Sequence, residues 1–204
     1  MPVRTRARYN ALIVLHHIPK DCSSAPDAFM IQAILFDFNG VIIDDEPLQL
    51  QAYREALGID GISITDEDYY RLLGTDDRAF VREIFERAGK PLSDETLMGL
   101  IERKTELHRE AIKEELPLFP GVVTFIRAAA RHYLLGVVSM ARRVEIAHVL
   151  ERARLFDMFA CIVSAEDARA CKPDPHCYQT AFDLLNQKRL AQRRLPLLAG
   201  ECLV

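Results

Sequence analysis

An apolar run that ends in a carboxylate constrains the fold of this chain more than any other feature. The run covers residues 31–36, and Asp37 follows it directly. Runs of this kind are typical of strands that are buried on both faces, as in parallel sheets. Two similar runs, at 133–138 and 159–163, each follow a helical pattern. The resulting βαβαβ order predicts an α/β fold with a parallel sheet and right-handed crossovers.

A long insert separates the first predicted strand from the second, and every segment of it has a helical pattern. Apolar residues recur there in two stripes at the spacing of a helix face. The stripes are Phe80, Val81, Ile84, Phe85 and Ala88, and then Leu97, Leu100, Ile101, Leu107, Ala111 and Ile112, with the charged Lys104 on the same face as the second stripe. We therefore predict a helical cap at 47–116, inserted into an α/β core formed by 30–46 and 117–204. Residues 1–29 lack a period that would bury a face, so we predict a loosely ordered N-terminal extension there.

The charge balance and the cysteine pattern narrow the range of partners and compartments. The 204 residues carry 26 Lys and Arg against 30 Asp and Glu, a net charge of −4, so no basic surplus favours nucleic acid. No apolar run approaches the roughly 18–20 residues of a membrane span. The five cysteines form no C-x-x-C pair, which favours a reduced compartment over a disulfide framework. We expect a cytoplasmic protein, a monomer or weak homo-oligomer, with no nucleic-acid or membrane partner.

Three polar side chains follow the predicted strands, at the sheet edge where open parallel sheets bind ligands. Asp37 follows the first run, Ser139 follows the second, and Lys172 comes after the third run and a short loop. A carboxylate, a hydroxyl and an ammonium group suit phosphoryl transfer, because they supply an attacking oxygen, a hydrogen-bond donor and a positive charge. Each alone is more often structural, as a turn former, a helix N-cap or a solvated cation. Their joint placement favours the chemical interpretation.

The same segments resemble the motifs of the haloacid dehalogenase (HAD) superfamily. The similarity is to the helical-cap branch, which contains β-phosphoglucomutase-like and phosphoglycolate-phosphatase-like enzymes. The stretch at 36–44, Phe-Asp-Phe-Asn-Gly-Val-Ile-Ile-Asp, resembles the first motif. Residues 118–122 resemble the return from cap to core, 137–139 the second motif, and 165–167 with 172–175 the stretch of the third motif. The resemblance implies a Rossmann-like parallel-sheet core with an inserted helical cap.

The resemblance also implies a mechanism. Asp37 would be the nucleophile that forms an aspartyl-phosphate, and Ser139 and Lys172 would hold the phosphoryl group. Mg²⁺ would be bound by Asp37 and by the backbone carbonyl of Asn39, and the substrate would be a small phosphorylated metabolite. The charges agree with these roles, because attack of one anion on another needs a metal and a cation to reduce their repulsion.

Three departures from the family pattern bear on activity. Position 39 is Asn where family hydrolases and mutases carry an Asp that transfers protons, and general acid–base catalysis is worth roughly 10²–10⁴-fold. Gln49 stands where β-phosphoglucomutase-like relatives commonly have a His, although a Gln on the surface of a helix is also what ordinary structure predicts. The family pattern continues after a strand such as 201–204 into an acidic fourth motif, whereas this sequence stops at Val204. We therefore expect an incomplete core, weak Mg²⁺ binding and weak activity.

Three functions stay open at this point. The first is a Mg²⁺-dependent phosphatase that acts on a small phosphorylated metabolite. The second is a β-phosphoglucomutase-like sugar-phosphate mutase, which Asn39 and Gln49 disfavour. The third is a catalytically silent phosphate-binding or interaction protein of the same fold. We predict the phosphatase, and acyl phosphates are candidate substrates because their leaving groups need little acid assistance.

Overall fold

A four-stranded parallel sheet forms the core of the protein. The computed structural model describes residues 30–204, and the extension predicted for 1–29 lies outside the described residues. The strands are β1 (Ala33–Phe36), β2 (Leu134–Val138), β3 (Cys161–Val163) and β4 (Cys202–Leu203), in the order β3-β2-β1-β4. Every pairing is parallel. The predicted α/β fold with a parallel sheet is confirmed, and each strand begins one or two residues later than the predicted run.

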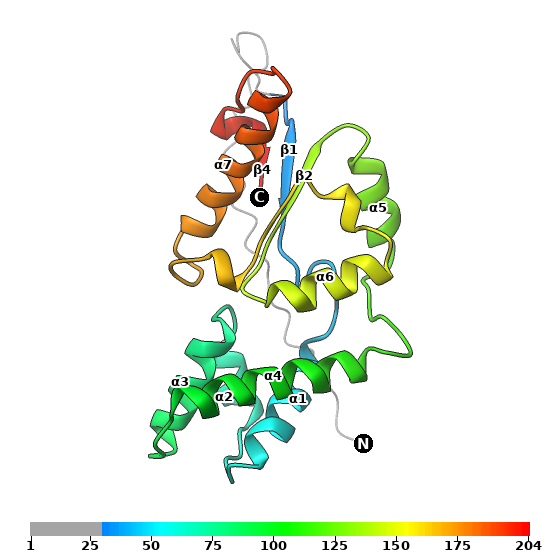
Figure 1. The fold of residues 1–204 in the computed structure, drawn as a ribbon. Helices are drawn as coiled ribbons and strands as arrows, with labels where there is room; N and C mark the ends of the chain where they lie inside the picture. The colour runs from blue at the N-terminus through cyan, green and yellow to red at the C-terminus, as the bar shows by residue number, and fades with distance from the viewer. Residues whose placement is uncertain (1–29) are drawn as a thin grey trace, which may run out of the picture.

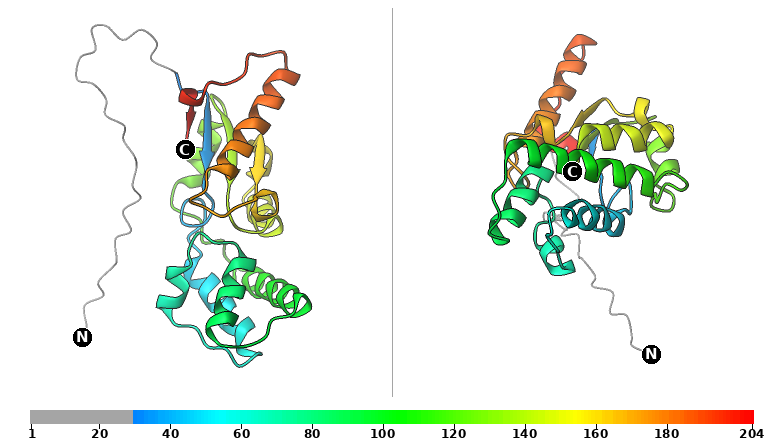
Figure 2. Two further views of the ribbon diagram at one scale, coloured as in Figure 1. Left: turned by 90° about the vertical axis from the view of Figure 1, so that its left-hand side faces the viewer. Right: turned by 60° about the horizontal axis from the view of Figure 1, so that its bottom comes forward.

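Helices cover both faces of the sheet (Figures 1 and 2). One face packs against α5 (Val122–Ala129) and α6 (Arg143–Arg152), and the other against α7 (His176–Ala191). Successive strand residues alternate between the two faces. Val137 belongs to the hydrophobic cluster on the side of α5 and α6, and Val138 belongs to the cluster on the side of α7. The sheet is therefore buried on both sides, which explains why the strand sequences lack polar alternation.

Four helices of the insert form a separate hydrophobic cluster. They are α1 (Glu46–Gly58), α2 (Asp66–Arg71), α3 (Asp77–Arg87) and α4 (Asp94–Ala111). Most of the apolar residues predicted on the third and fourth of these helices are buried in that cluster, with Phe80 and Leu97 among its most enclosed side chains. Ala88 and Ala111 are exposed instead, and Ile112 packs with the α/β core. We refer to these four helices as the cap. Figure 1 shows the cap beyond the carboxyl end of β1, where the strand-end residues lie.

The two segments that connect the cap to the core run side by side. Residues 43 and 118 form an antiparallel bridge. The backbone N–H of Asp44 donates to the carbonyl of Pro117 at 2.7 Å, and that of Phe119 donates to the carbonyl of Ile42 at 3.2 Å. The chain thus enters and leaves the cap through one paired link next to the carboxyl edge of the sheet.

Short elements complete the connections. Three 3-10 turns follow the later helices and strands, at Phe156–Met158, Ala165–Asp167 and Ala199–Glu201. None of the helices within residues 30–204 combines the length and the apolar character needed to cross a bilayer.

Candidate active site

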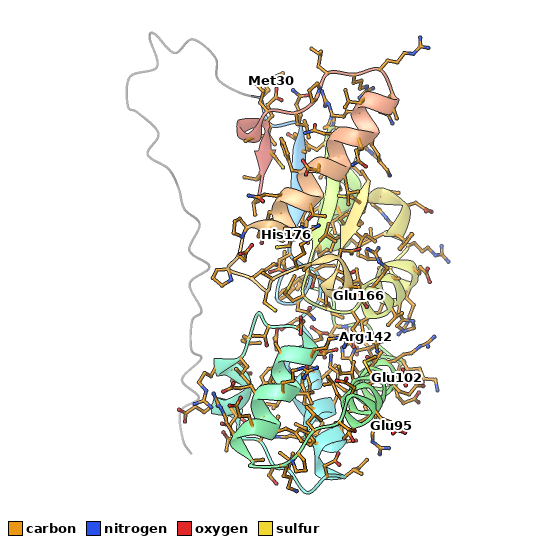
Figure 3. The ribbon with its side chains drawn as sticks, turned by 60° about the vertical axis from the view of Figure 1, so that its left-hand side comes forward. Met30, Glu95, Glu102, Arg142, Glu166 and His176 are labelled. Atoms are coloured by element: carbon orange, nitrogen blue, oxygen red, sulfur yellow. The ribbon has the colours of Figure 1, made fainter. Side chains whose placement is uncertain are left out.

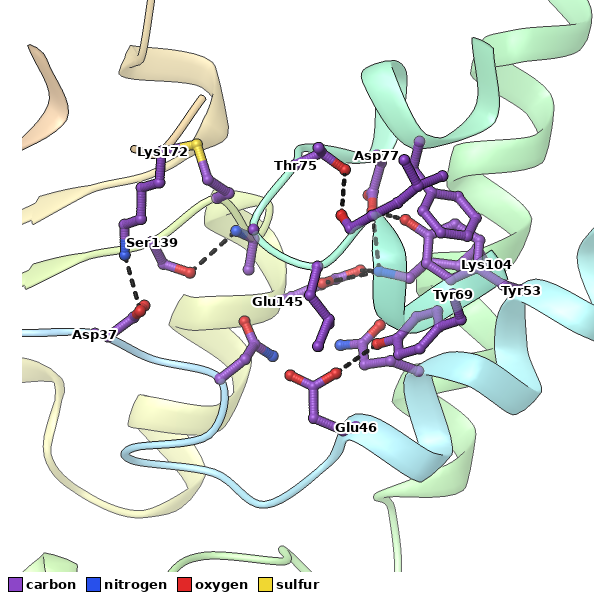
Figure 4. Close-up of a pocket in the computed structure, with 18 residues that line it drawn as sticks. Asp37, Glu46, Tyr53, Tyr69, Thr75, Asp77, Lys104, Ser139, Glu145 and Lys172 are labelled. Atoms are coloured by element: carbon purple, nitrogen blue, oxygen red, sulfur yellow. Dashed lines mark hydrogen bonds and ion pairs between the residues drawn. The ribbon is translucent and has the colours of Figure 1, made fainter. Parts of the chain in front are cut away.

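The strand-end side chains predicted from the sequence lie together at the carboxyl edge of the sheet. Lys172 Nζ lies 2.9 Å from Asp37 Oδ2 and donates to the carbonyl of Val138 at 2.9 Å. Asp37, Ser139 and Lys172 line one cavity of about 280 Å³ between the core and the cap (Figure 4). Asn39 lines the same cavity. The topology therefore brings all four predicted residues into a single site.

A tight turn after β1 holds the carboxylate of Asp37. Its Oδ1 accepts a hydrogen bond from the backbone N–H of Phe38 at 2.8 Å. The chain then reverses at Gly40, whose φ of 75° lies in the left-handed region that glycine adopts without strain. The Asp37 side chain stays 42% exposed, so the carboxylate is accessible to a ligand in the cavity.

Ser139 is buried, and its hydroxyl keeps a hydrogen to donate. Its backbone N–H donates to the carbonyl of Val163 at 2.9 Å, which fixes the residue next to β3. Its Oγ accepts a hydrogen bond from the backbone N–H of Ala141 at 3.0 Å. A hydroxyl that accepts in this way still has its own hydrogen for another acceptor. The geometry suits donation to an oxygen of a bound phosphoryl group.

The amide of Asn39 is oriented by a buried carboxylate. Asn39 Nδ2 donates to Asp45 Oδ1 at 3.0 Å and lies 3.2 Å from Asp45 Oδ2. Because an ionised carboxylate can only accept, the amide nitrogen must face Asp45 and the amide oxygen must face away. Asp45 is fully buried. A second carboxylate at position 39 would meet that of Asp45 at hydrogen-bond distance, so Asp45 favours an amide there over an acid.

Asp45 also joins the loop after β1 to two cap helices. Its Oδ2 accepts from Gln49 Nε2 on α1 at 3.0 Å and lies 2.7 Å from His108 Nε2 on α4. Burial alone would raise the pKa of this carboxyl, but His108 and the amides of Asn39 and Gln49 together hold the pKa below its usual value. Gln49 is only 5% exposed, so the surface position that ordinary helix structure predicted for it is wrong. Sequence reasoning missed Asp45 and His108.

A second buried charge cluster connects the cap to the core. Lys104 Nζ on α4 lies 3.2 Å from Asp77 Oδ1 on α3 and 3.1 Å from Glu145 Oε1 on α6. Tyr53 also donates to Asp77 Oδ1, at 2.5 Å. Burial by itself lowers the pKa of Lys104, but the two carboxylates outweigh burial and hold that pKa above its usual value. Sequence reasoning did not identify this cluster as part of the site. It did place Lys104 on the apolar face of its helix, which is the face that becomes buried.

Glu46, at the start of α1, brings a further carboxylate to the cavity. Tyr69 donates a hydrogen bond to Glu46 Oε2 at 2.6 Å. Burial raises the pKa of Glu46 and outweighs the opposing effect of this hydrogen bond, and the charges of Asp45 and Asp37 raise it further. Glu46 therefore holds its proton to a higher pH than an exposed glutamate does.

Arg142 and the acidic pair at 166–167 stabilise loops around the site. Arg142 Nη1 donates to Thr105 Oγ1 on the cap at 3.0 Å, and Figure 3 shows it at the junction of the core and the cap. Glu166 accepts from the backbone N–H of Arg143 at 3.0 Å, and Asp167 accepts from the backbone N–H of Ser164 at 2.8 Å. Hydrogen bonds to loop backbone therefore explain the positions of both Glu166 and Asp167.

The oxygen donors at the end of β1 fit a magnesium ion. Mg²⁺ usually takes one or two carboxylates and completes its shell with phosphate oxygens and water. Asp37 offers an accessible carboxylate, and the backbone carbonyl of Asn39 follows two residues later. Among residues 30–204, no three His, Cys, Asp or Glu side chains gather around a common metal position. The donor set therefore fits an ion that is held largely by the phosphate of its ligand and by water.

Glu145→Gln is expected to lower the free energy of unfolding by about 1.5–3 kcal/mol, because it removes one of the two carboxylates bonded to buried Lys104. Asp77 still neutralises the lysine, which limits the loss. Urea denaturation measures the change. The exposed Glu151 lies on the same helix, and Glu151→Gln should shift stability by less than about 0.5 kcal/mol. Equal stabilities of the two variants would contradict the importance of the buried cluster.

Glu46→Gln is expected to stabilise the protein at neutral pH and to leave its stability unchanged near pH 4. The pKa of Glu46 is raised above the ordinary glutamate value of 4.5, chiefly by burial. The folded state then binds more protons than the unfolded state between the two pKa values, so stability falls as pH rises through them. Glutamine removes this loss while its side-chain oxygen can still accept from Tyr69. Melting temperatures of both proteins at the two pH values test the sign, which a less stable variant at neutral pH would reverse.

The parallel sheet, the inserted helices and the polar cavity between them define an α/β protein of the capped, Rossmann-like class. Within this class, residues 34–191 match the haloacid dehalogenase-like hydrolase family. The chain belongs to that family.

Proteins similar to this chain include a phosphatase and a mutase. The phosphorylated carbohydrates phosphatase of Thermotoga maritima is 27% identical over 160 residues, which cover 76% of this chain and 71% of that protein. The structure of β-phosphoglucomutase from Clostridium difficile superposes with a TM-score of 0.69 at 25% identity, covering 77% of this chain and 72% of the other. CbbY of Rhodobacter sphaeroides, in complex with xylulose-(1,5)bisphosphate, gives a TM-score of 0.68 at 25% identity, with coverages of 76% and 73%.

Proposed function

We propose that this protein is a Mg²⁺-dependent phosphatase of a small phosphorylated metabolite, and that Asp37 forms an aspartyl-phosphate during turnover. The observation that carries the proposal is the contact between Asp37 and Lys172, 2.9 Å apart at the edge of the cavity. A nucleophilic carboxylate beside a fixed cation is what attack on an anionic phosphoryl group requires. The cavity of about 280 Å³ lies near the lower limit of ligand pockets, roughly 300 Å³, and suits a small substrate.

In the proposed reaction, a carboxylate oxygen of Asp37 forms a bond to phosphorus while the bond from phosphorus to the alcohol oxygen breaks. The leaving oxygen takes a proton from solvent water. A water molecule then attacks phosphorus and breaks its bond to the Asp37 oxygen, which releases inorganic phosphate and a proton to solvent and restores the carboxylate. Lys172 balances negative charge on the phosphoryl oxygens, and the hydroxyl of Ser139 donates a hydrogen bond to one of them. Mg²⁺, held by Asp37 and the carbonyl of Asn39, would reduce the repulsion between the two anions.

Asn39 limits the proposed reaction at its proton transfers. Its amide can orient a leaving oxygen or a water molecule, but it neither supplies nor removes a proton. We therefore propose weak activity on ordinary phosphate esters and better activity on acyl phosphates, because their leaving groups need less protonation. Position 49 does not favour the alternative function of a sugar-phosphate mutase. Gln49 cannot titrate, and its amide nitrogen donates to Asp45.

Acetyl phosphate and p-nitrophenyl phosphate test the proposal directly. We expect release of phosphate in the presence of Mg²⁺ and its loss on chelation, with acetyl phosphate consumed faster than the aryl ester. The intact mass of the protein after brief incubation with acetyl phosphate should show the gain of one phosphoryl group. A protein that binds phosphate but shows neither turnover nor the added mass would be the catalytically silent alternative.

A further inference from the structure

Two buried acceptor atoms on the cap side of the cavity lack a hydrogen-bond partner among the described residues. They are Gln49 Oε1 and Asp77 Oδ2. Both residues line the cavity, and they are only 5% and 8% exposed. The orientation of Gln49 is not arbitrary, because its Nε2 donates to the Asp45 carboxylate and leaves Oε1 as the open acceptor. Buried polar atoms are rarely left unsatisfied, so these two positions point to a ligand that donates hydrogen bonds.

The donors around these atoms are already engaged within the protein. Tyr53 donates to Asp77 Oδ1 and Tyr69 donates to Glu46 Oε2. Lys104 is held by Asp77 and Glu145. Figure 4 shows these pairs on the side of the cavity away from Lys172. The cap side of the cavity therefore offers acceptors to a ligand, because its phenol and ammonium donors are turned to neighbouring carboxylates and the hydroxyl of Thr75 donates to the carbonyl of Leu72.

The charge on this side of the cavity is negative when its acids are ionised. Glu46 and Asp77 of the cap contribute two carboxylates, and Glu145 of α6 adds a third where it contacts Lys104. Lys104 is the one cation among the lining residues that the cap supplies. Lys172, the other lining cation, is held at the sheet edge by Asp37 and the carbonyl of Val138. A second phosphate or carboxylate on the ligand would meet like charges in a partly enclosed space, where such repulsion is weakly screened.

We propose that the part of the substrate remote from the transferred phosphoryl group carries hydroxyl or amino donors and no second anionic group. This inference rests on the proposed phosphatase function and narrows its substrate class. It separates this protein from the solved CbbY, whose structure holds a bisphosphate. The donors of the substrate would bind Gln49 Oε1 and Asp77 Oδ2, and the negative cap side would exclude bisphosphates and phosphorylated carboxylic acids.

Four esters of similar size test the inference on the full chain with Mg²⁺. Glucose 6-phosphate carries hydroxyls, glucosamine 6-phosphate adds an amine, 6-phosphogluconate adds a carboxylate, and fructose 1,6-bisphosphate adds a phosphate. We expect kcat/KM for the first two to exceed that for the last two by about tenfold or more. The ratio of the neutral to the amino ester shows which donor the site prefers. Hexyl phosphate, which has no donor on its chain, should be at least about tenfold poorer than glucose 6-phosphate.

Asp77→Asn should shift this selectivity, since it removes one charge from the cap side and keeps an acceptor oxygen. We expect the kcat/KM ratio of 6-phosphogluconate to glucose 6-phosphate to rise about threefold or more, as removal of one repulsive charge predicts. The ratio is independent of the folded fraction, and Glu46→Gln provides a second test if Asp77→Asn does not fold. Asp94, on the cap with a side chain 91% exposed, supplies the control Asp94→Asn, for which the ratio should stay constant.

The outcomes separate the inference from the function on which it rests. If acetyl phosphate is consumed but the anionic esters react as well as the neutral ones, or if no six-carbon ester reacts, the inference is overturned and the phosphatase stands. If neither acetyl phosphate nor any ester reacts, the proposed function fails and the inference fails with it.

Discussion

Asp37→Asn should abolish the phosphoenzyme and lower turnover of acetyl phosphate by at least about a thousandfold, because an amide does not replace a carboxylate as nucleophile. The substitution changes shape very little. An amide oxygen can still accept from the backbone N–H of Phe38, and Lys172 keeps its bond to the carbonyl of Val138. A loss of turnover would therefore reflect the missing nucleophile and not a change in the structure of the site. Phosphate release and the intact mass after exposure to acetyl phosphate measure it.

The next aspartate along the chain provides a matched control. Asp44 is exposed and does not line the cavity, so Asp44→Asn should retain both turnover and the added mass. Mg²⁺-dependent turnover by Asp37→Asn, or a phosphoryl group on that variant, would show that another residue is the nucleophile.

The sheet and the residues at its carboxyl edge could be predicted because both depend on short-range pattern. Each apolar run specifies a buried strand, and the residue after it must lie at the edge where a parallel sheet binds ligands. Asp37 and Ser139 were placed in this way. The close approach of the strands has a local cause as well: a Cβ on Gly136 would lie 2.6 Å from Leu35 Cδ2 and 2.8 Å from Cys161 Sγ.

The residues that the cap contributes could not be predicted in the same way. Asp45 and His108 are 63 residues apart, and Lys104 and Glu145 are 41 apart. Whether such side chains meet depends on how the cap sits on the core, which no periodicity within one helix determines. The burial of Gln49 follows from the same arrangement, since its partner Asp45 is enclosed from both α1 and α4.

Asp45 supplies a physical reason for the amide at position 39, and it indicates how a carboxyl group could be restored there. Asp45 Oδ1 accepts from Asn39, whereas Oδ2 accepts from Gln49 and contacts His108. An amide at position 45 can reproduce this division, with its nitrogen in the place of Oδ1 and its oxygen in the place of Oδ2. A carboxylate at 39 would then accept the hydrogen bond that Asn39 now donates.

The double variant Asn39→Asp with Asp45→Asn should raise kcat for glucose 6-phosphate or another alkyl ester by about 10²–10⁴-fold, the range of general acid–base catalysis. The hydrogen bonds between the exchanged groups and with Gln49 are preserved, with the donor and acceptor reversed at one of them. Acetyl phosphate should gain much less, because its leaving group needs little protonation. Initial rates of phosphate release for the two substrates measure this contrast.

Asn39→Asp alone should gain less than the double variant and should melt at a lower temperature. Two carboxylates would then face each other at the distance of the present hydrogen bond, and one of them would have to hold a proton or move away. Asp45→Asn alone leaves two amides and no new acid, so its rates should not rise. If the single Asn39→Asp variant is as active and as stable as the double variant, Asp45 is not what keeps an amide at position 39.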